Sequence, residues 1–213
     1  INETYDLLAP GKLHITGEVI SAIEHCLLAL PGVTVDELRV VMSHPQALAQ
    51  CHGFFAKHPQ LAARQEIDTA GSARKVAATG DRTIAAIASS AAAKTYGLAI
   101  LAQGIQSSSG NATRFVEISP RPAPLADGIN AKTSLVLALA DRPGALGEIL
   151  QRFAAKGLSL TKIESRPIPE APFTYRFYVD VLGHAASVPF VAVLDELRAL
   201  TTELRVLGSY EAA

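Results

Sequence analysis

The chain has little of what marks secreted, membrane-spanning or zinc-binding proteins. Only Cys26 and Cys51 are cysteines among its 213 residues, and they do not form a CxxC pair. A disulfide framework or a zinc knuckle is therefore not expected, and free thiols in a reducing cytoplasm are the simpler interpretation. The apolar runs 85–88 and 98–102 are far shorter than the roughly 20 residues that cross a bilayer. We therefore predict a cytoplasmic protein without a membrane partner.

Common catalytic motifs are also missing. The sequence holds no GxSxG elbow, no Walker loop and no GxGxxG, so the usual hydrolase, NTPase and dinucleotide signatures are absent. Histidines gather early, but no HExxH or paired-ligand spacing joins them, and surface or cleft histidines are favoured over metal ligands. They are His14, His25, His44, His52 and His58. No metal is predicted.

Charge excludes further classes of protein. The chain is 49% apolar and 18% charged, with a formal net charge of -1. Such a balance is not typical of a disordered segment, a polybasic nucleic-acid-binding surface or an acidic tail. We expect a globular protein of one large or two small domains, with no nucleic-acid partner.

The beginning of the sequence is unusual. Ile1-Asn-Glu-Thr4 contains no initiator Met and no charged segment that leads into an apolar signal core. We therefore expect the sequence to begin within a longer protein.

The first half alternates strands with helices. Leu38–Met42 is predicted as a buried strand, and Pro45 opens a helix whose apolar residues recur at spacings of three and four. The pattern then repeats, with strands at 65–68, 83–88 and 98–102 and helices at 70–78 and 90–96, the last ending at Gly97. This alternation predicts an α/β layer.

A proline-rich segment separates this half from the next. Residues 119–128 cannot continue a strand ladder, so we place a linker at 120–131, between a first domain at 1–119 and a second at 132–213. In the second domain the predicted strands are 133–139, 158–163, 173–181 and 203–207, with helices around 146–154 and 190–197. The order βαββαβ predicts a ferredoxin-like fold.

Two polar turns in the first half occupy positions where α/β proteins bind ligands. Ser43-His44-Pro45-Gln46 and Thr69-Ala70-Gly71-Ser72 each close a predicted strand and open a helix. Free backbone N–H groups and small side chains at such a place suit a carboxylate. The alternative is a simple helix cap, and the presence of two such turns favours a ligand site.

These stretches resemble a known family. Ser43-His-Pro-Gln-Ala-Leu-Ala-Gln-Cys51, Asp68-Thr-Ala-Gly-Ser-Ala, Ala85-Ala-Ile-Ala-Ser89, Tyr96-Gly-Leu and Asn111-Ala-Thr-Arg-Phe115 are similar in order and spacing to prephenate dehydratases. The resemblance implies a two-lobed catalytic domain like periplasmic binding proteins, present here without its amino-terminal part. It implies conversion of prephenate to phenylpyruvate, water and carbon dioxide, without a metal or organic cofactor.

The resemblance also suggests site residues. Thr113 is placed beside the leaving hydroxyl, and Gln50 and Arg114 are further catalytic candidates. In an extended strand Asn111, Thr113 and Phe115 share one face, and Arg114 points away. Arg114 then either binds a carboxylate from a strand end or braces the loop. The candidates for substrate binding are Ser43, His44, Thr69, Ala70, Ser72, Asn111 and Phe115.

The second half resembles an ACT domain, a regulatory module. Arg142-Pro-Gly-Ala-Leu146 and Ile163-Glu-Ser-Arg-Pro167 look like the effector motifs of that domain. Joined to the first half, the domain implies feedback by phenylalanine, bound between two subunits of a homodimer or homotetramer. The implied effector-binding residues are Gly144, Ala145, Leu146, Glu164, Ser165 and Arg166.

Two features depart from the family pattern. The glycine-rich opening and the Glu-Asn-Ser or similar site motif would precede residue 1, and Ser107 stands where relatives commonly carry an acidic residue. The alternative function, from another class of protein, is a non-catalytic sensor of amino acids or small anions that uses the same lobes without turnover. The intact stretch from Asn111 to Phe115 favours the enzyme.

Overall fold

The computed structural model describes residues 7–8, 11–108, 110–124, 128–168 and 171–213. The expectation about Ile1–Thr4 and the linker residues 125–127 lie outside these ranges. The chain divides into two compact units. One is Ser21–Thr113, and the other combines Ile1–Ile20 with Arg114–Ala213. The first unit is therefore inserted in sequence between two segments of the second.

The inserted unit contains a five-stranded mixed sheet in the order β4-β3-β5-β2-β6. Strand β3 runs parallel to β4 and to the central strand β5, while β2 is antiparallel to β5 and β6. Every residue of β5 is buried, as expected for a parallel strand that is covered on both faces. The strands are β2 Cys26–Ala29, β3 Val40–Ser43, β4 Ala62–Gln65, β5 Ile84–Ala88 and β6 Ala99–Ala102.

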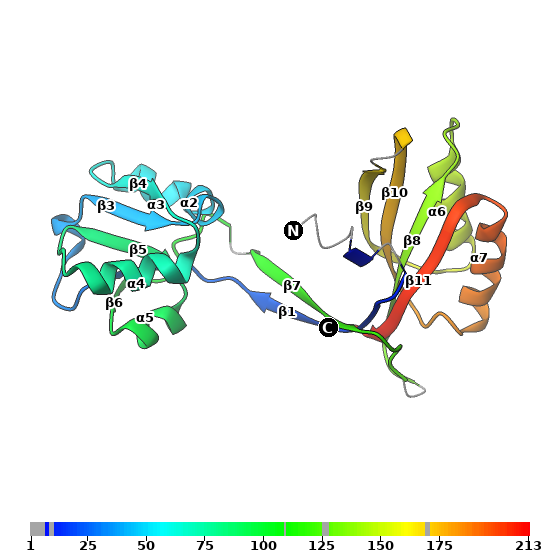
Figure 1. Cartoon of the computed structure of the whole chain (residues 1–213), viewed down its shortest axis with the longest axis horizontal. Coiled ribbons are helices and arrows are strands. Elements are labelled where there is room, and N and C mark those ends of the chain that lie inside the picture. Colours follow the sequence, from blue (N-terminus) through cyan, green and yellow to red (C-terminus); the bar gives the residue numbers. More distant parts are fainter. Residues whose placement is uncertain (1–6, 9–10, 109, 125–127, 169–170) are drawn as a thin grey trace. The chain divides into compact units, whose positions relative to one another are not determined.

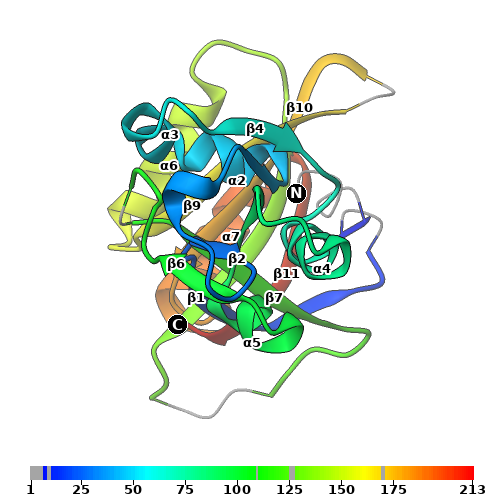
Figure 2. The same cartoon turned by 90° about the vertical axis from the view of Figure 1, so that its left-hand side faces the viewer.

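Helices cover both faces of this sheet. Neighbouring residues such as Leu27 and Leu28 belong to different core clusters, because successive side chains in a strand point to opposite faces. One cluster includes residues of α2 and α3, and the other includes residues of α4 and α5 (Figure 2). The helices are η1 Val35–Glu37, α2 Pro45–Gln50, α3 His52–Lys57, α4 Thr69–Thr79 and α5 Ser90–Tyr96.

The sequence predicted most of these elements but not β2 or η1, and two of the predicted elements differ in their bounds. The helix that opens at Pro45 is interrupted at Cys51, which is a cap residue between α2 and α3. The strand predicted at 65–68 is instead β4, and residue 68 is the N-cap of α4. The expected end of α5 is confirmed, since Gly97 has a φ of 66° in the left-handed region that glycine adopts readily.

The other unit contains an antiparallel sheet in the order β11-β8-β10-β9, with α6 and α7 beside it (Figure 1). Its element order confirms the predicted βαββαβ fold, and with it the fold class. The elements are β8 Ala131–Leu139, α6 Ala145–Ala155, β9 Leu160–Ile168, β10 Ala171–Leu182, α7 Val188–Arg198 and β11 Thr201–Glu211.

Both faces of this sheet are also covered. Leu135 and Leu137 pack with residues of α6 and α7, whereas Val136 packs on the opposite side with Leu8 and Ile15. A two-stranded sheet joins β1 (His14–Ala22) to β7 (Ala112–Ser119). Since residues 114–119 group with the second half of the chain, the domain boundary at 120–131 stays a proposal. No helix in the described part of the chain is long and apolar enough to span a membrane.

Candidate functional site

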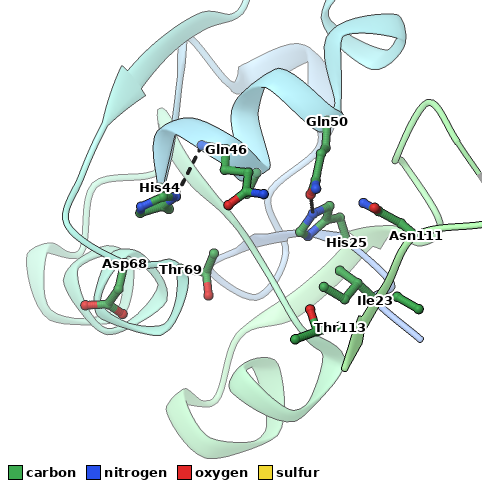
Figure 3. Close-up of a pocket in the computed structure, with 11 residues that line it drawn as sticks. Ile23, His25, His44, Gln46, Gln50, Asp68, Thr69, Asn111 and Thr113 are labelled. Carbon is green, nitrogen blue, oxygen red and sulfur yellow. Dashed lines mark hydrogen bonds between the residues drawn. The ribbon is translucent and has the colours of Figure 1, made fainter. Parts of the chain in front are cut away.

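An open pocket of about 340 Å³ lies within the inserted unit (Figure 3). Segments that are far apart in the sequence form its wall: the connection from β1 to β2, the starts of α2 and α4, and the start of β7. Most of its side chains are polar. The lining residues are Ile23, His25, His44, Gln46, Ala47, Gln50, Asp68, Thr69, Asn111, Ala112 and Thr113.

The two polar turns predicted from the sequence meet at this pocket. His44 caps α2, where its Nδ1 accepts a hydrogen bond from the backbone N–H of Gln46 at 3.2 Å. Asp68 caps α4 and accepts from the N–H of Gly71 at 2.5 Å. The helix-cap interpretation and the ligand-site interpretation are therefore compatible, because capping side chains also line the pocket.

His25 and Gln50 form a contact that links two walls of the pocket. The Nε2 atom of His25 lies 2.7 Å from Oε1 of Gln50. Since an amide oxygen only accepts, Nε2 carries the proton and donates. The amide NH₂ of Gln50 then keeps both N–H groups for other acceptors. The pair is held further by Gln106, whose Oε1 accepts from the His25 backbone N–H at 3.0 Å.

His25 and Asp68 are pocket residues that were not among the predicted site residues. Motif spacing classed His25 with the surface or cleft histidines, but it is buried directly before β2. A histidine next to the apolar run Cys26–Ala29 was the available signal, since a buried imidazole needs a hydrogen-bonding partner.

Three predicted substrate-binding residues do not line the pocket. The hydroxyl of Ser43 is fully buried and donates to the carbonyl of Ile87 at 2.6 Å. Ser72 is also buried, and its hydroxyl donates to the carbonyl of Asp68 at 2.7 Å. Ala70 is exposed outside the lining. The two serines stabilise the sheet and the first turn of α4, because their hydroxyl protons are used there.

Phe115 and Arg114 also lie outside the pocket lining. Phe115 is 59% exposed and borders a separate hollow formed by β1 and β7. The guanidinium of Arg114 contacts Glu18, Asp180 and Tyr210. Of the predicted site residues, the pocket thus brings together His44, Gln50, Thr69, Asn111 and Thr113.

The nearby cysteine is not a nucleophile at neutral pH. Cys51 is fully buried behind α2, and burial raises the pKa of its thiol to about 11. A thiol with this pKa is almost entirely protonated near pH 7. Among the described residues, no three His, Cys, Asp or Glu side chains gather as a metal site would require.

A second pocket, of about 140 Å³, lies at the start of α6. Ala145 and Leu146 line it, together with Arg142 from the preceding turn and Tyr175 and Phe177 from β10. Gly144, the N-cap of α6, has a φ of 82°. Glycine adopts this backbone conformation readily, whereas a residue with a Cβ would be strained there. The other predicted effector-binding residues, Glu164, Ser165 and Arg166, lie on β9 and not in this lining.

Comparison with known proteins identifies both halves of the chain. The model of the family described as prephenate dehydratase matches residues 1–123, and the ACT domain model matches residues 133–200. Arogenate dehydratase/prephenate dehydratase 2 of Arabidopsis thaliana is 44% identical over 222 residues, which cover 99% of this chain and 57% of that protein. The chain spans about half the length of the curated relatives it matches.

Solved structures are similar over almost the whole chain. A prephenate dehydratase in complex with L-Phe from Arthrobacter aurescens has a TM-score of 0.88 and 35% identity, covering all of this chain and 71% of that one. A structure described as GqqA, a novel type of quorum quenching acylase, has a TM-score of 0.85 and 36% identity. That likeness covers 97% of this chain and 75% of that one.

The predicted cytoplasmic location is contradicted by these comparisons. Five similar proteins of Arabidopsis thaliana, 42–44% identical, carry the word chloroplastic in their names. The expectation rested on two unpaired cysteines and on apolar runs too short to cross a membrane. Neither feature distinguishes the cytoplasm from another reducing compartment.

Proposed function

Because the chain belongs to the prephenate dehydratase family, we propose that it forms part of an enzyme that converts prephenate to phenylpyruvate, water and carbon dioxide. The observation that carries the proposal is the pocket in which Gln50, Asn111 and Thr113 lie together. These three polar side chains come from segments about sixty residues apart in sequence, and they belong to stretches on which the family resemblance rests.

The reaction requires positioning and charge stabilisation. Loss of one carboxylate of prephenate as carbon dioxide pushes electrons toward the ring hydroxyl, which leaves as the ring becomes aromatic. Aromatisation drives the step. The enzyme has to hold a dianion in a reactive orientation and stabilise negative charge on the departing oxygen.

Thr113 is the proposed donor to that oxygen. A threonine hydroxyl is a very weak acid, so hydrogen-bond donation in the transition state is its role, and water supplies the proton. The amide NH₂ of Gln50, oriented by His25, and the side chain of Asn111 are further donors at the same wall. Thr69, at the start of the eleven-residue helix α4, lies where backbone N–H groups favour a carboxylate.

Arogenate is the second candidate substrate, and the names of the plant relatives favour it. Arogenate carries an amino group where prephenate carries a ketone, and the same elimination then yields phenylalanine. The carboxylate of Asp68 lines the pocket and suits an ammonium group. Prephenate and arogenate therefore differ at a group, ketone or ammonium, that the Asp68 carboxylate could distinguish.

An acylase activity has less support in the pocket. Acyl transfer needs a nucleophile activated by an adjacent base. In the described pocket, the ring of His25 bonds Gln50 and the ring of His44 accepts from a backbone N–H. The nearby Ser43 hydroxyl donates to a backbone carbonyl and the Cys51 thiol stays protonated.

Phenylalanine is the proposed effector, and the ACT domain is its proposed site. The Arthrobacter relative was solved with L-Phe, and Ala145 and Leu146 line a pocket here. Assembly into a homodimer or homotetramer through ACT domains follows from the same proposal, since the effector would sit between two subunits.

One experiment separates these functions. The complete-length protein is incubated with prephenate, with arogenate and with an acyl-homoserine lactone. We expect phenylpyruvate absorbance from prephenate, and phenylalanine from arogenate if the second substrate is used. Hydrolysis of the amide bond that releases the acyl chain, with no product from prephenate or arogenate, would indicate the acylase. Binding of the dianions without any product would indicate the sensor.

A further inference from the structure

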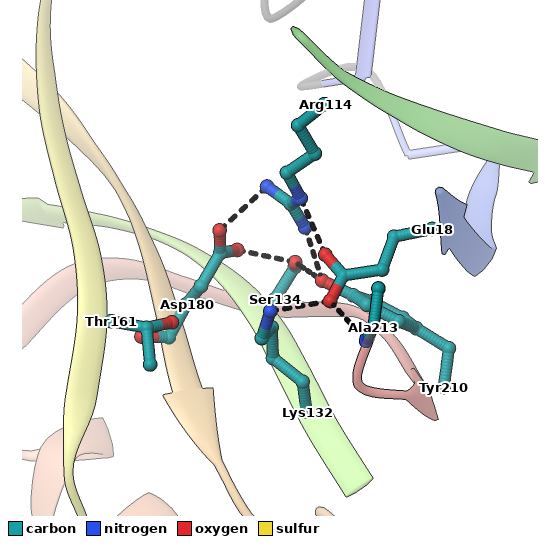
Figure 4. A network of polar contacts seen from close by, with 8 residues as sticks. All are labelled: Glu18, Arg114, Lys132, Ser134, Thr161, Asp180, Tyr210 and Ala213. Carbon is teal, nitrogen blue, oxygen red and sulfur yellow. Dashed lines mark hydrogen bonds and ion pairs between the residues drawn. The ribbon is translucent and has the colours of Figure 1, made fainter. Parts of the chain in front are cut away.

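Arg114 follows Thr113 in the chain, and its guanidinium contacts three protein side chains. Its Nε donates to Glu18 at 2.5 Å, its Nη1 to Asp180 at 2.7 Å and its Nη2 to the hydroxyl of Tyr210 at 2.5 Å (Figure 4). Each of the three guanidinium nitrogens therefore has an acceptor from the protein. Arg114 is 26% exposed, and the side chain of Glu18 is fully buried.

The hydrogen bonds around Arg114 close into a ring. Ser134 donates its single hydroxyl proton to Asp180 at 2.5 Å, so it must accept from Tyr210, whose oxygen lies 2.6 Å away. Arg114 then donates to both Tyr210 and Asp180, the two ends of this chain. Burial raises the pKa of Tyr210 to about 12, so the phenol stays protonated and these hydrogen bonds are kept near neutral pH.

The network is electrically balanced. Lys132 pairs with Glu18, so two positive side chains, Arg114 and Lys132, face two negative ones, Glu18 and Asp180. Burial acts to raise the pKa of Glu18, but hydrogen bonds from Lys132, from a backbone N–H and from Arg114 outweigh it and lower that pKa. Removal of Arg114 alone would leave one unpaired negative charge at a buried place.

The partners of Arg114 tie strand β7 to the sheet of the ACT domain. Ser134 lies on β8, Asp180 on β10 and Tyr210 on β11, and Glu18 lies on β1, the partner strand of β7. In a strand, neighbouring side chains point to opposite faces. Holding the Arg114 side chain in this network therefore also sets the face of β7 toward which the Thr113 side chain points.

We propose that Arg114 is a positioning residue for Thr113, which it orients by binding β7 to the ACT sheet through Glu18, Asp180 and Tyr210. This inference rests on the proposed function for the role of Thr113. It assigns Arg114 to protein partners and replaces the catalytic contact that the family resemblance suggested. Substrate binding by Arg114 is the competing role.

A single and a double variant of the complete-length protein distinguish positioning of Thr113 from substrate binding by Arg114. Arg114→Met keeps the length of the side chain and removes its charge. We expect kcat to fall by roughly ten- to a hundredfold, since a misplacement of about 1 Å costs that much. KM should stay within about threefold, because no substrate contact is lost. A raised KM with unchanged kcat would overturn the proposal, as would an unchanged kcat in the folded variant.

The double variant Arg114→Met/Asp180→Asn restores charge balance in the network. We expect it to recover most of the kcat lost in Arg114→Met, since no unpaired buried charge remains. A substrate-binding arginine would not be rescued by a change on β10. A double variant no better than Arg114→Met would therefore overturn the proposal.

Arg176→Met is the matched control. Arg176 is 30% exposed, lies on β10 of the same sheet and pairs with Glu203 on β11, but it is not adjacent to Thr113. We expect its kcat to equal that of the parent. An equal loss in Arg176→Met would show a general effect of disturbing the sheet and would overturn the specific role of Arg114.

The kcat of Asp180→Asn and amide hydrogen exchange of β7 also test the role of Arg114. Should Arg114→Met fail to fold, Asp180→Asn alone is used; we expect a several-fold fall in kcat, and an unchanged kcat would overturn the proposal. Amide hydrogen exchange of β7 should also be faster in these variants and unchanged in Arg176→Met. Exchange does not depend on turnover, so it tests the network even if the parent acts on neither prephenate nor arogenate.

Discussion

Thr113 carries the main prediction at the level of single residues. We expect Thr113→Ala in the complete-length protein to lower turnover by on the order of a hundredfold or more, the usual effect of losing one transition-state donor. Thr113→Ser keeps a hydroxyl and should retain far more activity. Turnover of the Ala variant within a few-fold of the parent, with the fold intact by circular dichroism, would remove Thr113 from the reaction.

Asp68 offers a test of substrate choice. Asp68→Asn removes the charge from the pocket and keeps a side-chain oxygen that can accept from the Gly71 N–H, so the α4 cap is preserved. We expect kcat/KM for arogenate to fall by more than kcat/KM for prephenate, because only arogenate carries an ammonium group. Equal changes for the two substrates would mean that Asp68 does not read that group.

His25 is expected to act through Gln50. His25→Phe keeps an aromatic ring but removes the donor that holds the Gln50 amide, so the amide can rotate. We expect kcat to fall on the order of tenfold, as is usual when the support of a site residue is lost. His52→Phe is the control, because His52 is exposed and bonds only the Ala49 carbonyl among the described contacts. Equal kcat values for the two variants would contradict this role.

The sequence predicted part of the site and missed the rest for a physical reason. Gln50 and Thr113 were placed together by the family resemblance, and the structure puts both in one pocket. Ser43 and Ser72 belong to the same stretches, but the direction of a hydroxyl depends on the nearest free carbonyl, which sequence does not reveal. The contact of His25 with Gln50 joins residues 25 positions apart and exists only once the sheet is formed.

Among the secondary-structure elements, the start of α6 carries a prediction on regulation. Gly144→Val places a branched side chain beside the pocket lined by Ala145 and Leu146, and we expect loss of phenylalanine inhibition with uninhibited turnover nearly unchanged. An added Cβ meets no atom within 4 Å, so the approach of the ligand is what changes. The left-handed backbone at Gly144 adds strain of roughly 1–2 kcal/mol.

A control for that strain lies at the other end of α6. Gly157 has a φ of 68° and also meets no atom within 4 Å on addition of a Cβ, but it follows the carboxyl end of α6, whereas Gly144 directly precedes the lining residues Ala145 and Leu146. Gly157→Val should therefore keep phenylalanine inhibition. Calorimetry on Gly144→Val that still showed phenylalanine binding at the parental affinity would place the effector site elsewhere.

Most elements with a strong apolar pattern were predicted from the sequence, although the buried strand β2 was not. Helix α5 and strand β8 follow such patterns and lie close to their predicted bounds. The position of strand β4 was predicted three residues too late. This edge strand, Ala62–Gln65, is exposed along its whole length and has no apolar face that would mark it in the sequence. Strand β1 mixes polar and apolar residues, and its partner β7 lies about ninety positions later.

The whole molecule carries a prediction about completeness. The chain spans about half the length of its curated relatives, and the family's glycine-rich opening is not among residues 1–213. We expect residues 1–213 alone to fold but not to turn over prephenate, since they span only about half the length of those relatives. A measurable turnover number from this segment would contradict that expectation. Turnover by the complete-length protein in the same assay is the control.

The insertion of one unit within the other also determines the order of folding during synthesis. Residues 21–113 emerge from the ribosome as a continuous segment and can fold at once, because domains generally fold as units. Leu8 has to wait, since its backbone carbonyl accepts from Arg205, which is 197 residues further along the chain. At roughly 5–20 residues per second, that wait lasts on the order of ten seconds or more. During it, Leu8 and Ile15 lack the side chains of the ACT sheet, such as Val136 and Leu207, against which they pack in the folded protein.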